Sequence, residues 1–314
     1  MTREAFENAI AVDMAIGGST NTALHLPAIA HEAGVDLPLR VFDEISRKSA
    51  YITKMSPGGT YHMQDLDEAG GISAVMKELT KLGLIHTGAQ TVTGTIASRI
   101  EHAEILNHEV IHGVENAYMH KGGIAILTGN LAPDGSVIKE SAVDRDLLVY
   151  KGTARCFDAE EDAIEAIIGG KIHEGDVVVI RYEGPKGSGM PEMHMTTDAI
   201  VYDQTLNHSV ALITDGRFSG ASSGPCIGHI SPEAVEGGPI ALIENDDLIE
   251  IDIPNRRLNI VGVKGQKKTP EEITAILAER KKNWKLPQLK PKSPVQRLYS
   301  KLAVSAMAGA YLDV

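Results

Sequence analysis

The sequence predicts an α/β (α+β) chain in which a helical first part is followed by a β-barrel-like part with inserted helices. Two patterns within the 314 residues point to this order. Up to about residue 115, apolar side chains recur with the helical period. From about residue 122 they form short continuous runs bounded by turn residues, which are typical of strands. The change of period therefore predicts two regions of different secondary structure.

Amphipathic stretches separated by glycine pairs predict packed helices in the first region. These stretches cover residues 3–15, 22–33, 40–48 and 65–82. In the second region, apolar runs predict strands that are buried on both faces. These runs cover residues 123–129, 176–182, 210–214 and 240–243.

Alternating residues at 247–263, on both sides of a Pro254-Asn255 turn, predict a hairpin with one solvent-exposed face. Helical segments at 159–168 and 231–236 interrupt the strands. Because helices and strands do not alternate regularly, we expect a closed or nearly closed barrel rather than a doubly wound sheet.

A threonine N-cap, a proline at the first helical position and a capping-box glutamate predict a helix from Thr269 to about Asn283. A proline-rich linker at 287–294 and a last helix at 295–309 follow. The expected domains are residues 1–118, 119–286 and 287–314.

Composition restricts the classes of function. The formal net charge of −12 is spread along the chain, which argues against a nucleic-acid surface. No apolar run approaches the roughly 20 residues that span a bilayer, and the sequence does not start like a secretion signal. Cys156 and Cys226 lie outside any C-x-x-C spacing, so neither a disulfide framework nor a self-contained thiolate metal site is expected. We expect a cytoplasmic protein that binds neither nucleic acid nor membrane.

The segment from Gly184 to Met193 contains one candidate metal ligand. The segment follows a predicted strand, and its glycines and prolines precede its only carboxylate, Glu192. A glycine-rich backbone approaches a ligand closely, and Mg²⁺ prefers carboxylate oxygen. The alternative interpretation is a solvated turn with a chance glutamate.

A second polar loop, Thr214 to Gly220, follows the next predicted strand. Asp215 and Arg217 are expected to satisfy each other and the turn backbone, whereas Ser219 has the exposure that a reacting hydroxyl needs. A serine is a poor base unless a cation stabilises its alkoxide. This requirement links Ser219 to Glu192 and its predicted metal.

The pattern Gly220-x-Ser222-x-Gly224 also matches the nucleophile elbow of esterases. The match is poor, because Gly220 comes six positions after Thr214, the end of the strand, and Pro225 stands where the helix should begin. We do not favour a hydrolase.

Residues 17–22 lie between two predicted helices and have two interpretations. A serine or threonine here caps the second helix, or the helix N-terminus binds an anionic group of a substrate. In the second case Thr20 and Asn21, together with Arg217 of the other loop, are the candidate substrate contacts.

Taken together, six ordered motifs resemble the dihydroxy-acid dehydratase / phosphogluconate dehydratase family over the whole chain, most closely the dihydroxy-acid dehydratases. The motifs are Gly18-Ser-Thr-Asn21, the glycine-rich stretch 123–135, Phe157-Asp-Ala-Glu-Glu161, Gly189-Met-Pro-Glu-Met193, Thr214-Asp-Gly-Arg-Phe-Ser-Gly220 and Gly228-His-Ile-Ser-Pro-Glu-Ala234.

The resemblance implies that water is removed from a 2,3-dihydroxy carboxylic acid to give a 2-keto acid, with an iron–sulfur cluster (2Fe-2S or 4Fe-4S) as Lewis acid and Mg²⁺ on the substrate. Ser219 matches the family's proton-accepting serine, and Glu192 its Mg²⁺-ligating glutamate. The implied fold is the helical remainder of an α/β domain followed by a swivelling, β-barrel-like catalytic-base domain. We expect a branched-chain substrate and pathway, and a homodimer when complete.

The sequence departs from the family in one respect. The family's three cluster cysteines and its other acidic Mg²⁺ ligands precede the Gly-Ser-Thr-Asn motif, and Cys156 and Cys226 do not occupy those positions. We therefore expect the C-terminal portion of an enzyme, inactive alone and dependent on a missing cluster-bearing half or partner chain. A sugar-acid dehydratase and a non-catalytic binding or assembly module remain alternatives.

Overall fold

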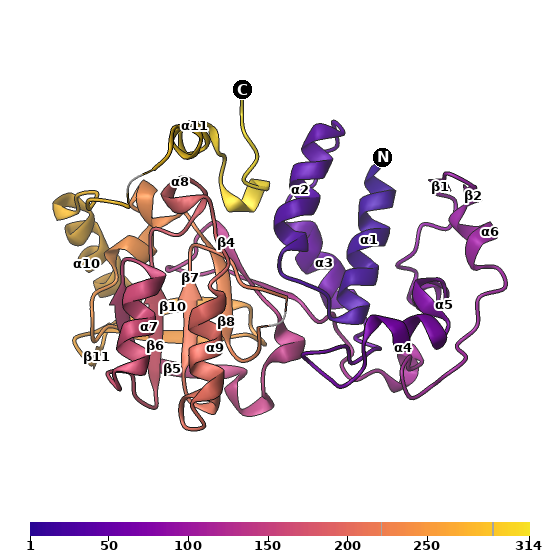
Figure 1. Ribbon diagram of the computed structural model, residues 1–314, viewed down its shortest axis with the longest axis horizontal. Coiled ribbons are helices and arrows are strands. Elements are labelled where there is room, and N and C mark those ends of the chain that lie inside the picture. Colours follow the sequence, from indigo (N-terminus) through magenta and orange to yellow (C-terminus); the bar gives the residue numbers. More distant parts are fainter. Residues whose placement is uncertain (221, 291) are drawn as a thin grey trace. The chain divides into compact units, whose positions relative to one another are not determined.

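The computed structural model describes residues 1–220, 222–290 and 292–314 (Figure 1). Ala221 of the predicted Gly-x-Ser-x-Gly pattern and Pro291 of the predicted linker lie outside the described residues. The chain forms two compact units. Unit 1 comprises Met1–Ala125 and Lys139–Ala142, and unit 2 comprises Ile126–Ile138 and Val143–Val314.

Unit 1 is mainly helical. Its first helices agree with the predicted ranges: α1 (Arg3–Ile16), α2 (Thr22–Glu32) and α3 (Arg40–Lys48). The predicted stretch 65–82 is interrupted, because Gly70 adopts a φ of +121° and its Cβ position would lie 2.3 Å from the Glu104 carbonyl oxygen. The remaining elements are α4 (Met63–Glu68), α5 (Gly71–Leu79), η1 (Thr80–Leu82), β1 (Gln90–Thr91), β2 (Gly94–Thr95), α6 (Ile96–Ile100) and η2 (Val114–Asn116).

An aliphatic core holds unit 1 together. Ala11 and Ala15 of α1 pack with Val75 and Leu79 of α5 and with Ile111, all of them almost completely buried. Small residues on α1 let its backbone approach the larger aliphatic side chains of its neighbours. The core therefore fixes the start of the loop that leads from α1 to α2.

Unit 2 is built on a mixed sheet, whose strand order in the described part of the chain is β11-β10-β9-β5-β6-β7-β8-β4-β3. The strands are β3 (Ala125–Leu127), β4 (Gly135–Ile138), β5 (Val149–Phe157), β6 (Asp176–Ile180), β7 (Ala211–Thr214), β8 (Cys226–Ser231), β9 (Leu248–Asp252), β10 (Arg257–Val263) and β11 (Gln266–Lys267).

The sheet curls so that its two ends meet. Thr128, just after β3, donates to the Arg256 carbonyl at 3.0 Å and accepts from the Leu258 N–H at 3.0 Å. These bonds join the end of β3 to the start of β10. The prediction of an α/β chain with a barrel-like second region is confirmed.

Strands β5 to β8 run parallel and are flanked by helices α7 (Glu160–Ile168) and α9 (His194–Tyr202), which lie side by side (Figure 1). Ala163 and Ile200 of these helices share a core with Val178 and Leu212 of β6 and β7. Strands β6 and β7 are thus buried on both faces, as their continuous apolar runs predict. The carboxyl ends of parallel strands lie at one edge of the sheet, where the loops after β6 and β7 meet.

Three predicted elements differ from the structure. Residues 240–242 of the predicted strand 240–243 belong to η7 (Pro239–Leu242), because a proline at the first position after Gly238 begins a helical turn. The segment 231–236 is helical only over η6 (Ala234–Glu236). The last helix is shorter than predicted and is followed by a second short turn. These elements are α11 (Pro294–Leu302) and η8 (Ala306–Ala308).

Other features of unit 2 agree with the sequence. The hairpin is formed by β9 and β10, and α10 (Pro270–Asn283) begins with the predicted capping box of Thr269 and Glu272. The connecting short elements of unit 2 are η4 (Arg145–Leu147), α8 (Pro185–Ser188) and η5 (Leu206–His208), whereas η3 (Glu140–Ala142) belongs to unit 1. Within the described residues, no helix has the length and apolar character that crossing a bilayer requires.

Candidate functional site

Two loops at the carboxyl edge of the parallel strands carry the main predicted site residues. The β6 loop comprises residues 181–193, which contain α8, and the β7 loop comprises residues 215–220 and 222–225 in the part that the structure describes. Because β6 and β7 are neighbours, with Ile180 paired to Thr214, the two loops leave the sheet side by side.

Glu192 and Arg217 join these loops. They form an isolated parallel bridge, in which the Met193 N–H donates to the Arg217 carbonyl at 2.8 Å and the Arg217 N–H donates to the Pro191 carbonyl at 3.3 Å. The Arg217 Nη1 donates to Glu192 Oε1 at 3.1 Å, and its Nε donates to the Met190 carbonyl at 2.8 Å. The guanidinium therefore fixes both the backbone beside Glu192 and the direction of its carboxylate.

The Glu192 side chain suits a hard cation but supplies only one ligand. It is 34% exposed, and a carboxylate has acceptor sites beyond the one that Arg217 uses. Among residues 1–220, 222–290 and 292–314, no group of three or more His, Cys, Asp or Glu side chains is arranged to hold a metal ion. Glu192 could thus complete a Mg²⁺ site whose other ligands come from elsewhere, but it cannot form one alone.

Ser219 lies two residues after Arg217 and is half-buried. Its carbonyl accepts from the Ser222 N–H at 3.1 Å. The structure therefore brings Ser219 onto the same loop edge as the Glu192–Arg217 pair, where a nearby cation would favour its alkoxide.

Asp215 and Arg217 do not satisfy each other as the sequence suggested. The buried carboxylate of Asp215 instead accepts backbone hydrogen bonds from three residues, and Arg217 reaches across to the β6 loop. Burial raises the pKa of Asp215 to about 7, and the adjacent Glu233 and Glu183 add to this rise, while its backbone donors oppose it. The difference has a physical reason: three backbone N–H groups already compensate the buried Asp215 carboxylate, whereas the Arg217 guanidinium reaches the Met190 carbonyl and Glu192.

Thr20 and Asn21 lie in unit 1, in the turn between α1 and α2. Asn21 is the N-cap residue of α2 but makes no side-chain cap bond, and the Ser19 hydroxyl accepts from the Asn21 N–H at 3.2 Å. The Ser19 carbonyl also accepts from the Thr22 N–H at 3.0 Å, so Ser19 caps the turn that leads into α2, as the capping interpretation expects. Thr20 is buried, and the role of both residues as substrate contacts stays a prediction.

The turn is organised by Asp13, a residue that sequence reasoning missed. Its buried carboxylate accepts from the Ser19 N–H at 3.3 Å and from the Thr22 hydroxyl at 2.8 Å. A Cβ on Gly18 would lie 1.8 Å from Asp13 Oδ1, so only glycine leaves room for this carboxylate. Burial raises the pKa of Asp13 to about 7, although nearby Lys139 opposes the rise. The sequence offered one signal for this role, namely an aspartate on the buried side of the helix α1.

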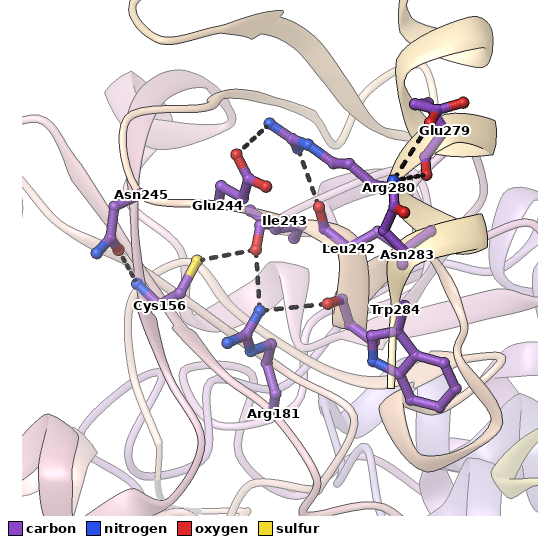
Figure 2. A pocket seen from close by; sticks show the side chains of 11 residues that line it. Cys156, Arg181, Leu242, Ile243, Glu244, Asn245, Glu279, Arg280, Asn283 and Trp284 are labelled. Carbon is purple, nitrogen blue, oxygen red and sulfur yellow. Dashed lines mark hydrogen bonds and ion pairs between the residues drawn. The ribbon is translucent and has the colours of Figure 1, made fainter. Parts of the chain in front are cut away.

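A pocket of about 500 Å³ lies in unit 2 beside α10 and η7 (Figure 2). Arg181 donates to the Ile243 carbonyl at 2.9 Å and pairs with Asp158, while Arg280 pairs with Asp247 and Glu244. Its two guanidinium groups are thus engaged by carbonyls and carboxylates of the fold. We therefore interpret the side chains of this pocket as structural contacts of unit 2, and none of the predicted site residues lines it.

Both cysteines are unsuited to hold an iron–sulfur cluster. Cys156 borders the pocket, where its thiol donates to the Ile243 carbonyl at 3.6 Å, and the Cys226 thiol donates to the Ser223 carbonyl at 3.3 Å. Burial raises the pKa of each thiol to about 12. Because a cluster is bound by thiolates, these protonated and separately placed side chains do not fit it.

The esterase interpretation is not supported by the local fold. In the described residues between β7 and β8, 215–220 and 222–225, no helix is assigned, and β8 begins directly at Cys226. A nucleophile elbow requires a strand-to-helix turn.

Comparisons with known proteins agree with the motifs. Residues 109–310 match the family described as "Dihydroxy-acid/6-phosphogluconate dehydratase C-terminal", and residues 1–100 match the family's N-terminal description. Proteins named dihydroxy-acid dehydratase are 59% identical over 316 residues in Clostridium novyi and 54% identical over 312 and 316 residues in Caldanaerobacter subterraneus and Ignicoccus hospitalis.

These alignments cover 100%, 99% and 100% of this chain but only 55%, 54% and 55% of the respective relatives. The chain thus spans about half the length of the curated relatives it matches. The resemblance that the six motifs indicated is confirmed, and the chain belongs to the dihydroxy-acid/6-phosphogluconate dehydratase family.

Proposed function

We propose that this chain is the catalytic-base part of a hydro-lyase that converts a 2,3-dihydroxy carboxylic acid to a 2-keto acid. The observation that carries the proposal is the convergence of Glu192, Arg217 and Ser219 on adjoining loops at the carboxyl edge of β6 and β7. This edge is where ligands bind in sheets of parallel strands. The family membership supports the same reaction.

In the proposed reaction, Ser219 acts as an alkoxide and takes the proton from C2 of the substrate. The electron pair of that C–H bond forms the C2–C3 double bond of an enol as hydroxide leaves C3. The proton that Ser219 took converts the hydroxide to water, which regenerates the alkoxide, and the enol becomes the 2-keto acid as its C2 hydroxyl loses a proton and C3 gains one. Arg217 holds Glu192 in place, so that both loops keep their geometry while Ser219 changes its protonation state.

Two cofactors accompany this reaction in our proposal. Glu192 would ligate Mg²⁺, which supplies positive charge that stabilises substrate oxygens and the serine alkoxide. An iron–sulfur cluster does not fit Cys156 or Cys226, so no step of the reaction is assigned to it on this chain. We propose that its thiolates come from a cluster-bearing half that is not part of this chain, that the chain alone is inactive, and that the complete enzyme is a cytoplasmic homodimer.

The proposed substrate is a branched-chain dihydroxy acid, which would place the enzyme in the synthesis of branched-chain amino acids. The names of the three relatives support a dihydroxy acid. The family description also includes a phosphogluconate dehydratase, so a sugar acid is the alternative substrate within the same chemistry.

Complementation tests the proposal. The chain is mixed with a separately produced polypeptide covering the part of the Clostridium novyi relative that it does not match. Iron, sulfide and Mg²⁺ are added, and 2-keto-acid formation is followed from a branched-chain dihydroxy acid and from an aldonate. We expect turnover only when both polypeptides are present, and faster turnover with the branched-chain acid.

A non-catalytic binding or assembly module is the second hypothesis. It predicts that the two polypeptides form a complex in which the cluster is reconstituted but neither substrate is turned over. That outcome, with the cluster verified by its absorption spectrum, would refute the enzyme proposal.

A further inference from the structure

We propose that Asp215 is a positioning residue, whose buried carboxylate ties the segments after β6, β7 and β8 into one rigid frame for Ser219 and Glu192. This inference rests on the proposed function, since it assigns Asp215 a part in the same reaction. Asp215 itself would touch neither substrate nor metal.

The Asp215 carboxylate bonds to the backbone on two sides. Its Oδ1 accepts from the Glu183 N–H at 3.0 Å, and its Oδ2 accepts from the Tyr182 N–H at 3.2 Å, both at the start of the β6 loop. The same Oδ2 accepts from the Ala234 N–H at 2.7 Å, just beyond β8. One side chain that follows β7 thus satisfies donors from both neighbouring segments.

The β6 loop is consequently held to the β7 loop at both of its ends. Asp215 binds the start of the loop, and Arg217 binds its end through the Met190 carbonyl and Glu192. Only Gly216 separates these two residues, and a Cβ there would lie 3.1 Å from the Glu183 carbonyl oxygen. A shift of the β6 loop at Asp215 would therefore be transmitted to Glu192.

A second buried carboxylate strengthens the frame at the middle of the β6 loop. Glu233 lies beside Ala234 and accepts from the N–H groups of Lys186 and Gly187 at 3.0 Å. A Cβ on Gly184 would lie 2.5 Å from Glu233 Oε2. The segment after β8 is thus bonded to both the β7 loop and α8, which closes a ring of contacts around Asp215.

A carboxylate is the side chain that this arrangement requires. Three N–H donors converge on two oxygens that are inaccessible to water, and only a carboxylate presents acceptors at both positions. Asparagine has nearly the same shape but places an NH₂ group against at least one donor. A buried unsatisfied N–H is costly, so the backbone of the Asp215→Asn variant must shift to restore a partner.

The test compares Asp215→Asn with Asp176→Asn. Asp176 is also buried and accepts from the His173 N–H at 2.9 Å and from Arg155 at 3.0 Å, but it lies at the opposite end of β6. Both variants lose bonds of a buried carboxylate in unit 2. Only Asp215→Asn disturbs the edge that carries Ser219.

The first readout is hydrogen exchange of the backbone amides in the isolated full chain. Asp215→Asn should speed exchange of the Met193 and Arg217 amides at least tenfold, although neither amide contacts Asp215, whereas Asp176→Asn should leave both unchanged. The second readout is turnover in the complemented protein. A displacement of about 1 Å near the reacting atoms costs on the order of 100-fold, so kcat should fall by about that factor with KM within about threefold.

Unchanged Met193 and Arg217 exchange in Asp215→Asn, or equal effects on kcat in both variants, would overturn the proposal. If Asp215→Asn does not fold, hydrogen exchange of the wild-type chain tests the proposal instead. The Tyr182, Glu183 and Ala234 amides should then exchange as slowly as the amides of β7. Exchange of these three amides as fast as that of exposed loop amides would refute the rigid frame. If the complemented wild type has no turnover, the proposed function fails, whereas the exchange data still decide whether the frame exists.

Discussion

Replacing Arg217 by lysine perturbs the link between the two loops of the proposed site. Lysine keeps the positive charge but lacks the planar fork that reaches the Met190 carbonyl and Glu192 together. We expect Arg217→Lys to weaken the orientation of Glu192 rather than remove it. The direct consequence is a higher Mg²⁺ requirement for turnover.

The expected magnitudes follow from the contacts. The charged donor to the Met190 carbonyl contributes about 1.5–3 kcal/mol to stability. The pair with Glu192 adds less, about 0.2–1 kcal/mol, because its side chains are 27% and 34% exposed and therefore screened. Loss of a group that orients a metal ligand typically costs about 10- to 100-fold in metal affinity, so the half-saturating Mg²⁺ concentration should rise by that factor.

Arg155→Lys is the matched control for this prediction. Arg155 also donates to two partners in unit 2, Asp176 at 3.0 Å and Asp246 at 2.7 Å, and its side chain is 32% exposed. Urea unfolding measures the stability of both variants, and Mg²⁺ titration of turnover in the complemented protein measures the metal requirement. Equal losses of stability with no change in the Mg²⁺ requirement of Arg217→Lys would refute the reasoning.

Three further predictions use other residues. Glu192→Gln should abolish Mg²⁺-dependent turnover. The free energy of unfolding should change by no more than about 1 kcal/mol, because the ion pair with Arg217 is partly exposed. Retained Mg²⁺ dependence of turnover counts against Glu192 as a ligand. Folded Asp13 keeps its proton up to about pH 7, whereas unfolded aspartate releases it near 3.8. Between these values the contribution of Asp13 to the free energy of unfolding therefore falls by about 1.4 kcal/mol per pH unit as the pH rises. Urea unfolding at pH 5, 6 and 7 should show that Asp13→Asn lacks this slope, and identical slopes in both proteins contradict the raised pKa. Cys156 and Cys226 should resist alkylation by iodoacetamide at pH 8 in the folded chain, because burial holds both thiols protonated. Mass spectrometry measures the rate of alkylation. A rate equal to that of the unfolded chain would show that the two cysteines are accessible thiolates.

Much of the fold follows from the period of the apolar residues. The helices α1 to α3, the strands β6 and β7 and the β9–β10 hairpin each have a regular pattern over their own length, and their positions were predicted closely. The apolar run at 240–243 was misassigned as a strand, since a buried helical turn and a buried strand look alike over four residues. Pro239 was the signal that favours the turn.

Strands β5 and β8 were missed because glycine or polar residues interrupt their apolar pattern. Gly152 and Arg155 stand within β5, and Gly228 and His229 within β8. Pairing with neighbours that are distant in sequence makes these segments strands, and no local preference reveals it.

The sequence predicted the residue types of the candidate site but not the hydrogen-bond partners of each side chain. The sequence places Glu192 and Arg217 after two strands, and neighbouring strands bring them together. Sequence spacing suggested a pair between Asp215 and Arg217, whereas the structure bonds Asp215 to Tyr182, Glu183 and Ala234. Contacts of this kind join segments 19 to 33 residues apart, so they depend on the sheet order rather than on the local sequence.

The central claim is that Ser219 takes the proton from C2. Its most direct measurement is the single-turnover rate of the complemented protein with a substrate deuterated at C2, comparing Ser219→Ala with Ser222→Ala, a matched serine three residues further along the same loop. The account predicts that Ser219→Ala lowers the rate by about 10²- to 10⁴-fold, the usual contribution of a general base, while substrate affinity stays within about threefold. It also predicts that Ser222→Ala stays near the wild-type rate. A Ser219→Ala protein that removes water at the wild-type rate would contradict the account.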